Sequence, residues 1–371
     1  MSSTWAMIAG GGTAGHVVPG LAVARALVAR GHAPETIHWV GSERGSEGRM
    51  VAEAGFEATL LPGRGIQRRV TVENVGAVLG LARAGGEALA LVRRRKPAVV
   101  LAMGGWASVS CAMAAVARGV PVVVAEQNAV PGASNRLVAR FAKAAAVPFP
   151  GTPLPRAVVT GNPVRAEILA VDRSAGGRVA ARRALGLPED RRVVAVFGGS
   201  LGALRLNHAV LGALEPWSDR GDLAVRHVIG ERDWTAVTAQ VGEQKPAGVF
   251  YQPVRYDDRR ELSLAAADLA VSRAGGNTVA ELAAVGLPSV LVPLPGAPGD
   301  HQTANARALS DAGAAVLVGD AEMTAARLVA EVDGLLGDPA RLDAMGTAAS
   351  AVARRDAAEA VAALVEAHAG R

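Results

Sequence analysis

His16 is the side chain in this sequence best suited to acid–base chemistry. It follows the glycine-rich turn Gly10-Gly-Gly-Thr-Ala-Gly15, which comes after a short apolar run and precedes apolar residues at helical spacing. This order predicts a strand, a tight turn that lets a ligand approach backbone amides, and a helix. The positive end of that helix favours a neutral imidazole that acts as a base near pH 7. A structural histidine is the alternative, and Glu126, at the end of a later strand, is the rival base.

The spacing Gly10-x-Gly12-x-x-Gly15 also matches the fingerprint of dinucleotide-binding enzymes. Such an enzyme needs an acidic residue at the end of the second strand, where it binds the ribose. Here the expected second strand, 37–40, runs into Gly41-Ser42, and Glu43 lies just beyond it. The sequence therefore disfavours a dinucleotide cofactor.

Strands and helices alternate through both halves of the chain, as expected for parallel sheets covered on both faces. Further glycine turns follow expected strands at 104–105, 198–202 and 275–276, and a proline-rich break at 148–155 separates the halves. We therefore expect an α/β protein with two Rossmann-like domains that face each other across a cleft. Their glycine turns lie at the carboxyl ends of strands, where such sheets bind ligands. The expected domains are 1–162 and 163–340, with a helix in 341–371 that packs back on the first domain.

Composition and charge restrict the class of protein. A single cysteine, Cys111, excludes an internal disulfide and fits a reducing cytoplasm. Residues 1–162 hold 17 Lys and Arg against 8 Glu and no Asp, a net charge of +9, whereas the remainder carries −4. The basic half points to an anionic partner. Aromatic residues make up only 3% of the chain, which disfavours nucleic acid and favours an anionic membrane surface.

The longest uncharged stretch, 97–117, has the length of a membrane span. Gly104-Gly105, Ser108 and Ser110 divide it into an expected strand, turn and helix. We therefore expect a buried strand–helix unit there, and no signal peptide is recognisable before it.

Several motifs occur along the chain in the order found in the MurG family of glycosyltransferases, which this sequence resembles from about residue 8 to 341. They are Gly10-Gly-Gly-Thr-Ala-Gly-His16-x-x-Pro19, Met103-Gly-Gly, Glu126-Gln-Asn128, Gly161-Asn-Pro-Val-Arg165, Gly198-Gly-Ser-x-Gly-Ala203, the turn 272–281 and His301-Gln302-x-x-Asn305. Leu201, Trp106 and Ala125 depart from the family's commonest pattern. These positions flank the motifs, so they affect fine substrate preference rather than the class of reaction.

The resemblance implies a GT-B fold and inverting transfer of N-acetylglucosamine from UDP-N-acetylglucosamine. The implied acceptor is undecaprenyl-pyrophosphoryl-N-acetylmuramoyl-pentapeptide, so that lipid I becomes lipid II in peptidoglycan synthesis. Residues 1–162 would then bind the acceptor and face the membrane, and residues 163–340 would bind the UDP-sugar. A protein of this family is peripheral to the cytoplasmic face of the cell membrane.

The resemblance also implies roles for individual residues. His16 or Glu126 is the expected base, and the expected substrate-binding residues are Thr13, Ala14, Gly15, Asn128, Arg165, Ser200, Asp257, Gly276, Asn277, Thr278, Val279, Ala280, Glu281 and Gln302. Among these, Glu281 would bind the ribose hydroxyls, and the backbone of Asp257 would read the uracil. Asn128 and Gln302 would contact the sugar, whose hydroxyls suit amide groups. Three of them have a structural alternative: Glu281 would also stabilise a helix N-terminus, Ser200 would cap a helix, and Arg165 would be a surface residue after a proline turn.

Transfer from a nucleotide sugar requires stabilisation of a departing diphosphate by a metal or by fixed positive groups. The sequence contains no Asp-x-Asp, the usual metal-binding pattern for this purpose. Arg165 and Ser200, each beside a turn, would supply the fixed groups. We therefore expect no metal and no other cofactor.

The expected membrane surface combines basic clusters with an apolar helical stripe. The basic residues are Arg64, Arg68, Arg69 and 93–96, and between them Val75, Val78, Leu79 and Ala82 recur at i, i+3, i+4 and i+7. Packing of this stripe on the sheet is the alternative to contact with lipid.

Two other functions fit parts of the sequence. A related nucleotide-sugar enzyme, either an epimerase or a glycosyltransferase of secondary metabolism, would share the fold and the donor site. A binding protein without catalysis would not need His16 beside a glycine turn. Release of UDP together with a newly linked sugar distinguishes the transferase from an epimerase.

Overall fold

The computed structural model describes residues 4–43, 47–62, 73–199, 202–241 and 248–370, without the side chains of 73–79, 81 and 82. These residues form two compact units, Met1–Arg165 with Arg354–Arg371, and Ala166–Ala353. The expected boundaries were 162 and 340. The second boundary lies later because α14 (Pro339–Val352) packs on α11 (Gly276–Ala284) and α13 (Ala325–Leu336) of the second unit.

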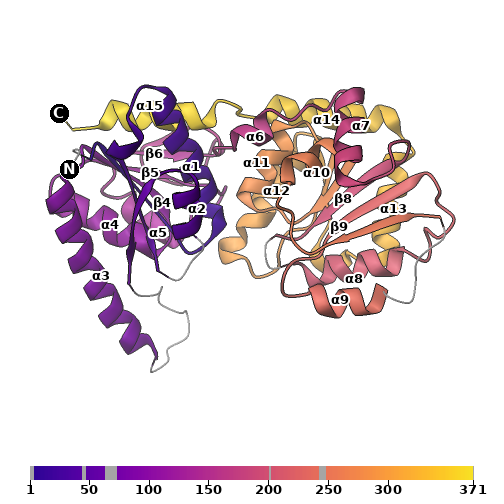
Figure 1. Cartoon of the computed structure of the whole chain (residues 1–371), viewed down its shortest axis with the longest axis horizontal. Coiled ribbons are helices and arrows are strands. Elements are labelled where there is room, and N and C mark those ends of the chain that lie inside the picture. Colours follow the sequence, from indigo (N-terminus) through magenta and orange to yellow (C-terminus); the bar gives the residue numbers. More distant parts are fainter. Residues whose placement is uncertain (1–3, 44–46, 63–72, 200–201, 242–247, 371) are drawn as a thin grey trace. The chain divides into compact units, whose positions relative to one another are not determined.

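The first unit is built on a parallel sheet of strand order β3-β2-β1-β4-β5-β6-β7 (Figure 1). Its strands are β1 (Ala6–Gly10), β2 (Ile37–Ser42), β3 (Glu57–Leu61), β4 (Val99–Gly104), β5 (Val122–Ala125), β6 (Ala144–Val147) and β7 (Ala157–Val159). Met7 of β1 pairs with His38 of β2 on one side and with Val100 of β4 on the other. This central position places the turn after β1 in the middle of the sheet's carboxyl edge.

Helices cover both faces of this sheet because β1 and β4 are apolar on both faces. Ala6 and Ile8 join one buried cluster with α1 (Ala14–Ala29) and α15 (Ala357–His368), whereas Met7 and Ala9 join another with α3 (Glu73–Arg95) and α4 (Trp106–Ala117). Shorter helices, α2 (Glu47–Glu53) and α5 (Ala133–Val138), follow β2 and β5.

Helix α15 comes from the far end of the chain and packs on α1 and on strands β4, β5 and β6, as Figure 1 shows. Its apolar residues recur at helical spacing, and Val361, Ala362 and Val365 are fully buried. The last described segment therefore completes the core of the first unit.

The second unit repeats the plan with a parallel sheet of strand order β10-β9-β8-β11-β12-β13. Its strands are β8 (Arg192–Phe197), β9 (Leu223–Val228), β10 (Phe250–Val254), β11 (Leu269–Ser272), β12 (Ser289–Leu291) and β13 (Ala315–Leu317). Its other helices are α6 (Ala166–Leu169), α7 (Ala175–Leu185), α8 (Leu204–Ala213), α9 (Trp234–Val241), α10 (Arg260–Ala266) and α12 (His301–Ser310). Short 3₁₀ turns lie at Pro298–Asp300 and Asp320–Glu322 in this unit and at Pro34–Thr36 in the first unit. Both sheets confirm the expected α/β class with two Rossmann-like domains.

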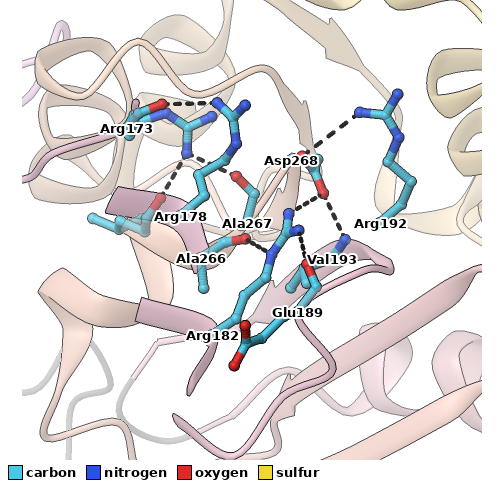
Figure 2. A network of polar contacts seen from close by, with 10 residues as sticks. Arg173, Arg178, Arg182, Glu189, Arg192, Val193, Ala266, Ala267 and Asp268 are labelled. Carbon is cyan, nitrogen blue, oxygen red and sulfur yellow. Dashed lines mark hydrogen bonds and ion pairs between the residues drawn. The ribbon is translucent and has the colours of Figure 1, made fainter. Parts of the chain in front are cut away.

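A network of arginines fixes the carboxyl end of α10 in the second unit (Figure 2). Arg173 donates to the carbonyl oxygens of Leu264 and Ala267, and Arg182 donates to that of Ala266 and to the carboxylate of Asp268. Positive charge at the end of a helix stabilises its unsatisfied carbonyl groups. Burial lowers the pKa of Arg173 to about 10, which leaves it charged at neutral pH. The network thereby holds α10, whose first residue enters the candidate site.

The stretch 97–117 forms β4, a turn at Gly105 and α4, as the sequence predicts. Over the described ranges, none of the helices combines the length and the hydropathy needed to cross a membrane.

Candidate active site

His16 lies in the first turn of α1, directly after the glycine turn that ends β1. Its Nδ1 is 3.1 Å from the carbonyl oxygen of Gly11. Because a carbonyl oxygen only accepts, Nδ1 carries the proton, and in the neutral ring Nε2 keeps its lone pair. A Cβ at Gly104, the last residue of β4, would lie 3.0 Å from Nε2. The basic nitrogen therefore lies against the carboxyl end of β4, where a ligand of this sheet is expected.

Burial lowers the pKa of His16, and the bond to Gly11 with the charges of Glu126 and Glu47 opposes this effect. The imidazole is therefore neutral at neutral pH, the state in which it accepts a proton. Thr13, Ala14 and Gly15 precede it as exposed residues at the positive end of α1.

Two glycine turns of the first unit touch through their backbones. Gly105 has a φ of 83°, and a Cβ there would lie 2.4 Å from the carbonyl oxygen of Gly11. Only glycine tolerates both that conformation and that approach. The turns after β1 and β4 are consequently fixed against each other. The imidazole of His16 lies beside both of them, next to Gly104.

Glu126 is 3% exposed and organises the loop after β5. Its Oε1 accepts from the backbone amides of Gln127 and Asn128 and from the side-chain amide of Asn128, at 2.9–3.1 Å. Its Oε2 accepts from the amide of Gly132 at 3.0 Å and from Nδ2 of Asn135 at 2.9 Å. These bonds occupy the lone pairs that a base would use, so the geometry favours His16 over Glu126 in that role. Asn128 is half-buried on the same loop.

In the second unit, Glu281 lies on α11 with its side chain 11% exposed and bonds to Nε of Arg260 at 3.1 Å. The guanidinium carbon of Arg260 lies 3.5 Å from the centroid of the Phe197 ring, at the end of β8. A charged side chain over an aromatic face and beside a carboxylate is held in one orientation. Arg260 thus fixes the carboxylate that is expected to bind ribose.

The remaining expected donor contacts surround the turn after β11. Gly276 and Val279 are buried, whereas Asn277, Thr278 and Ala280 are half-buried. Gln302 on α12 accepts through Oε1 from the amides of Ala274 at 3.2 Å and of Leu294 at 2.9 Å. These bonds leave its NH₂ group as a donor and tie α12 to the turn.

Asp257 lies before α10, and its side chain is buried and bonded to neighbouring side chains. Its Oδ1 accepts from Arg226 at 3.0 Å and from Ser263 at 2.9 Å. This side-chain anchoring agrees with a role for the backbone of Asp257 alone. Arg165 is half-buried at the end of the first unit, and Ser200 lies outside the described residues.

Sequence reasoning missed Glu47, Asn135 and Arg260, which bond to Gly12 in the glycine turn before His16, to Glu126 and to Glu281 respectively. None of them belongs to a recognisable motif, and their partners are 9 to 35 residues away. In the part of the chain that the structure describes, no group of three or more His, Cys, Asp and Glu is placed to hold a metal ion.

Two units with Rossmann-type parallel sheets and glycine turns at the strand ends define the GT-B class of glycosyltransferases. Family models match most of the chain: the glycosyltransferase family 28 N-terminal domain over residues 6–147 and the C-terminal domain over residues 193–361. A relative from a Nocardioides species, named UDP-N-acetylglucosamine--N-acetylmuramyl-(pentapeptide) pyrophosphoryl-undecaprenol N-acetylglucosamine transferase, is 44% identical, over 97% of this chain and 96% of its own.

A relative of the same name from Desulforudis audaxviator is 38% identical, and the alignment covers 98% of each chain. Among solved structures, MurG of Acinetobacter baumannii matches with a TM-score of 0.76 at 29% identity, over 98% of this chain and 99% of its own. The chain belongs to glycosyltransferase family 28 and, within it, to the MurG family. A UDP-GlcNAc 2-epimerase from Neisseria meningitidis, with a TM-score of 0.68 at 12% identity over 98% of this chain and all of its own, shares the fold alone.

Proposed function

We propose that the chain transfers N-acetylglucosamine from UDP-N-acetylglucosamine to the lipid-linked N-acetylmuramoyl-pentapeptide, and so converts lipid I into lipid II. The main support is the imidazole of His16, whose basic Nε2 lies at the carboxyl ends of β1 and β4. The chain is also 44% identical to a relative named as an N-acetylglucosamine transferase that acts on this acceptor. The first unit binds the acceptor, and the second unit binds the UDP-sugar. The product serves peptidoglycan synthesis and with it cell-wall growth, cell shape and division.

The reaction is a single displacement at the anomeric carbon. The acceptor hydroxyl attacks that carbon while Nε2 of His16 takes its proton, and the bond to the β-phosphate oxygen breaks with its electrons on UDP. Attack from the opposite side of the ring inverts the configuration. Arg165, Ser200 and the positive end of a helix stabilise the departing diphosphate in place of a metal.

The donor is recognised by groups around α11 and α12. Glu281 binds the ribose hydroxyls, the backbone at Asp257 reads the uracil, and residues 276–280 line the nucleotide. Gln302 and Asn128 are the amide side chains that suit recognition of sugar hydroxyls.

The test is an assay with labelled UDP-N-acetylglucosamine and the lipid-linked acceptor, followed by extraction of the lipid phase. Label should enter the lipid only when acceptor is present, and His16→Ala should lower turnover roughly 10²–10⁴-fold with UDP affinity near normal. An epimerase would consume the donor without acceptor, and a transferase of secondary metabolism would leave the lipid unlabelled. Unchanged turnover in His16→Ala would assign the base to another group.

We also propose that the first unit docks on the anionic cytoplasmic face of the cell membrane through α3. The stripe of Val75, Val78, Leu79 and Ala82 and the basic residues Arg64, Arg68 and Arg69 lie outside the described side chains. Further along α3, however, Ala84, Ala88 and Leu91 form the buried face, and Leu89 is 42% exposed on the other side. Leu89 is seven residues after Ala82, at the spacing of the stripe.

Vesicle co-sedimentation tests this docking. Arg95 is held by Glu57 at 2.5 Å, whereas Arg93 and Arg94 are exposed, so these two are the arginines to reverse. The variant with both changed to Glu should pellet less with anionic vesicles at low salt, since each lost contact weakens binding by about 1 kcal/mol. Reversal of Arg183 and Arg341, two exposed arginines of the second unit, should have no effect. Equal pelleting of both variants would remove α3 from the docking surface.

A further inference from the structure

Glu47, the first residue of α2, is a buried carboxylate with no part in the reaction as described so far. The residue is 1% exposed. Its Oε1 accepts from the backbone amide of Gly12 at 2.9 Å and from that of Ser42 at 3.1 Å. A Cβ at Gly11 would lie 2.5 Å from the same oxygen, so the approach of the carboxylate requires glycine there. Glu47 therefore bonds to the glycine turn that carries the catalytic helix.

One peptide group connects Glu47 to His16. The amide that Glu47 accepts from is the N–H of Gly12, and the carbonyl of the same peptide group is the Gly11 oxygen that accepts from Nδ1 of His16. The contacts form a chain in which Nδ1–H of His16 donates to the carbonyl of Gly11, and the N–H of Gly12 in the same peptide group donates to the carboxylate of Glu47. Hydrogen bonds arranged in this way polarise one another, so a carboxylate on the N–H makes the carbonyl a stronger acceptor.

We propose that Glu47 is a positioning residue that acts on His16 through the peptide group between Gly11 and Gly12. It holds the carbonyl of Gly11 in place, which fixes the proton on Nδ1 and leaves Nε2 as the base. The proposal rests on the proposed function for the role of His16 as the base. The position of the proton on Nδ1, however, can be measured in the protein without substrates.

Two carboxylates act electrostatically on His16, and they differ in what they bind. Glu126 has both oxygens bonded to the donors of its own loop, whereas Glu47 bonds to the peptide group that His16 itself uses. Both charges raise the pKa of His16 against the effect of burial. Loss of the Glu47 charge should therefore lower that pKa. It should also weaken the preference of the proton for Nδ1, which a bond of purely structural use would leave unchanged.

The experiment compares Glu47→Gln with Glu53→Gln. The first variant keeps an oxygen acceptor and removes the charge, and the second makes the same change at an exposed position of α2. Nitrogen NMR of His16 in the wild-type protein should show the neutral ring protonated at Nδ1. In Glu47→Gln the pKa of His16 should fall, and turnover at neutral pH should fall roughly tenfold. The acidic limb of the pH profile should move by the same amount as the pKa, with UDP affinity within twofold of normal.

Glu53→Gln should leave the pKa, the pH profile and turnover unchanged. A folded Glu47→Gln protein whose His16 keeps its wild-type pKa overturns the proposal. So does a wild-type protein whose neutral ring is protonated at Nε2, a result that needs no variant to fold. If the NMR results hold but His16→Ala retains transfer, the proposed function fails and the positioning contact stands.

Discussion

At the scale of single residues, Glu281 combines two functions in one carboxylate. It pairs with Arg260 in this structure, and the proposed function adds the two ribose hydroxyls as further partners. Glu281→Ala should weaken UDP binding by about 1.5–3 kcal/mol, the usual loss for hydrogen bonds to a charged group. The affinity difference between UDP and its 2′,3′-dideoxy analogue, measured by calorimetry, should then disappear. Glu261→Ala, on neighbouring α10, is the control and should preserve that difference. If the Glu281 variant still distinguishes the two ligands, the ribose assignment is incorrect.

At the scale of elements, the loop after β5 depends on Glu126 because this carboxylate bonds to donors across positions 127–135. Glu126→Ala leaves buried amides unsatisfied, so the free energy of unfolding should fall by roughly 2–4 kcal/mol. Glu126→Gln should also destabilise the protein, because its NH₂ group meets N–H donors. Urea denaturation measures both changes. Glu87→Ala on α3, where the side chain is 42% exposed, is the control and should change the free energy of unfolding by close to zero. A stable Glu126→Gln protein without transfer activity would return Glu126 to the role of base.

The elements themselves follow from local sequence, whereas much of the site does not. Apolar runs followed by glycine turns predict β1, β4, β8 and β11 with their helices, and they place His16 and Glu281 correctly on helices after strands. The side chains that orient those two residues arrive from other elements. Glu47 reaches Gly12 from 35 residues away, and Arg260 reaches Glu281 from 21. Such contacts depend on how helices pack beside the sheet, which no local pattern specifies. The packing of α14 likewise assigns residues up to Ala353 to the second compact unit, and no local pattern specifies that packing.

At the scale of the whole molecule, buried histidines make stability depend on pH. Burial lowers the pKa of His38 to about 4 and that of His227 to about 3. Below about pH 6.5 the unfolded chain binds protons at these positions and the folded chain does not, so stability is lost as pH falls from 6.5 towards 4. At pH 5 each histidine should cost about 2 kcal/mol relative to pH 7.5. Urea midpoints at the two pH values measure the loss, and His38→Gln should reduce it by about 2 kcal/mol. Equal loss in the variant would exclude His38 as a source.

The return of the chain to the first unit at Arg354 has a consequence for biosynthesis. A ribosome delivers all of the second unit, Ala166–Ala353, as one continuous segment, whereas the first unit lacks α15 until that unit has been made. The face of β4, β5 and β6 that α15 covers therefore stays open while the second unit is synthesised. The second unit is therefore able to complete its core first, although most of the first unit is made before it.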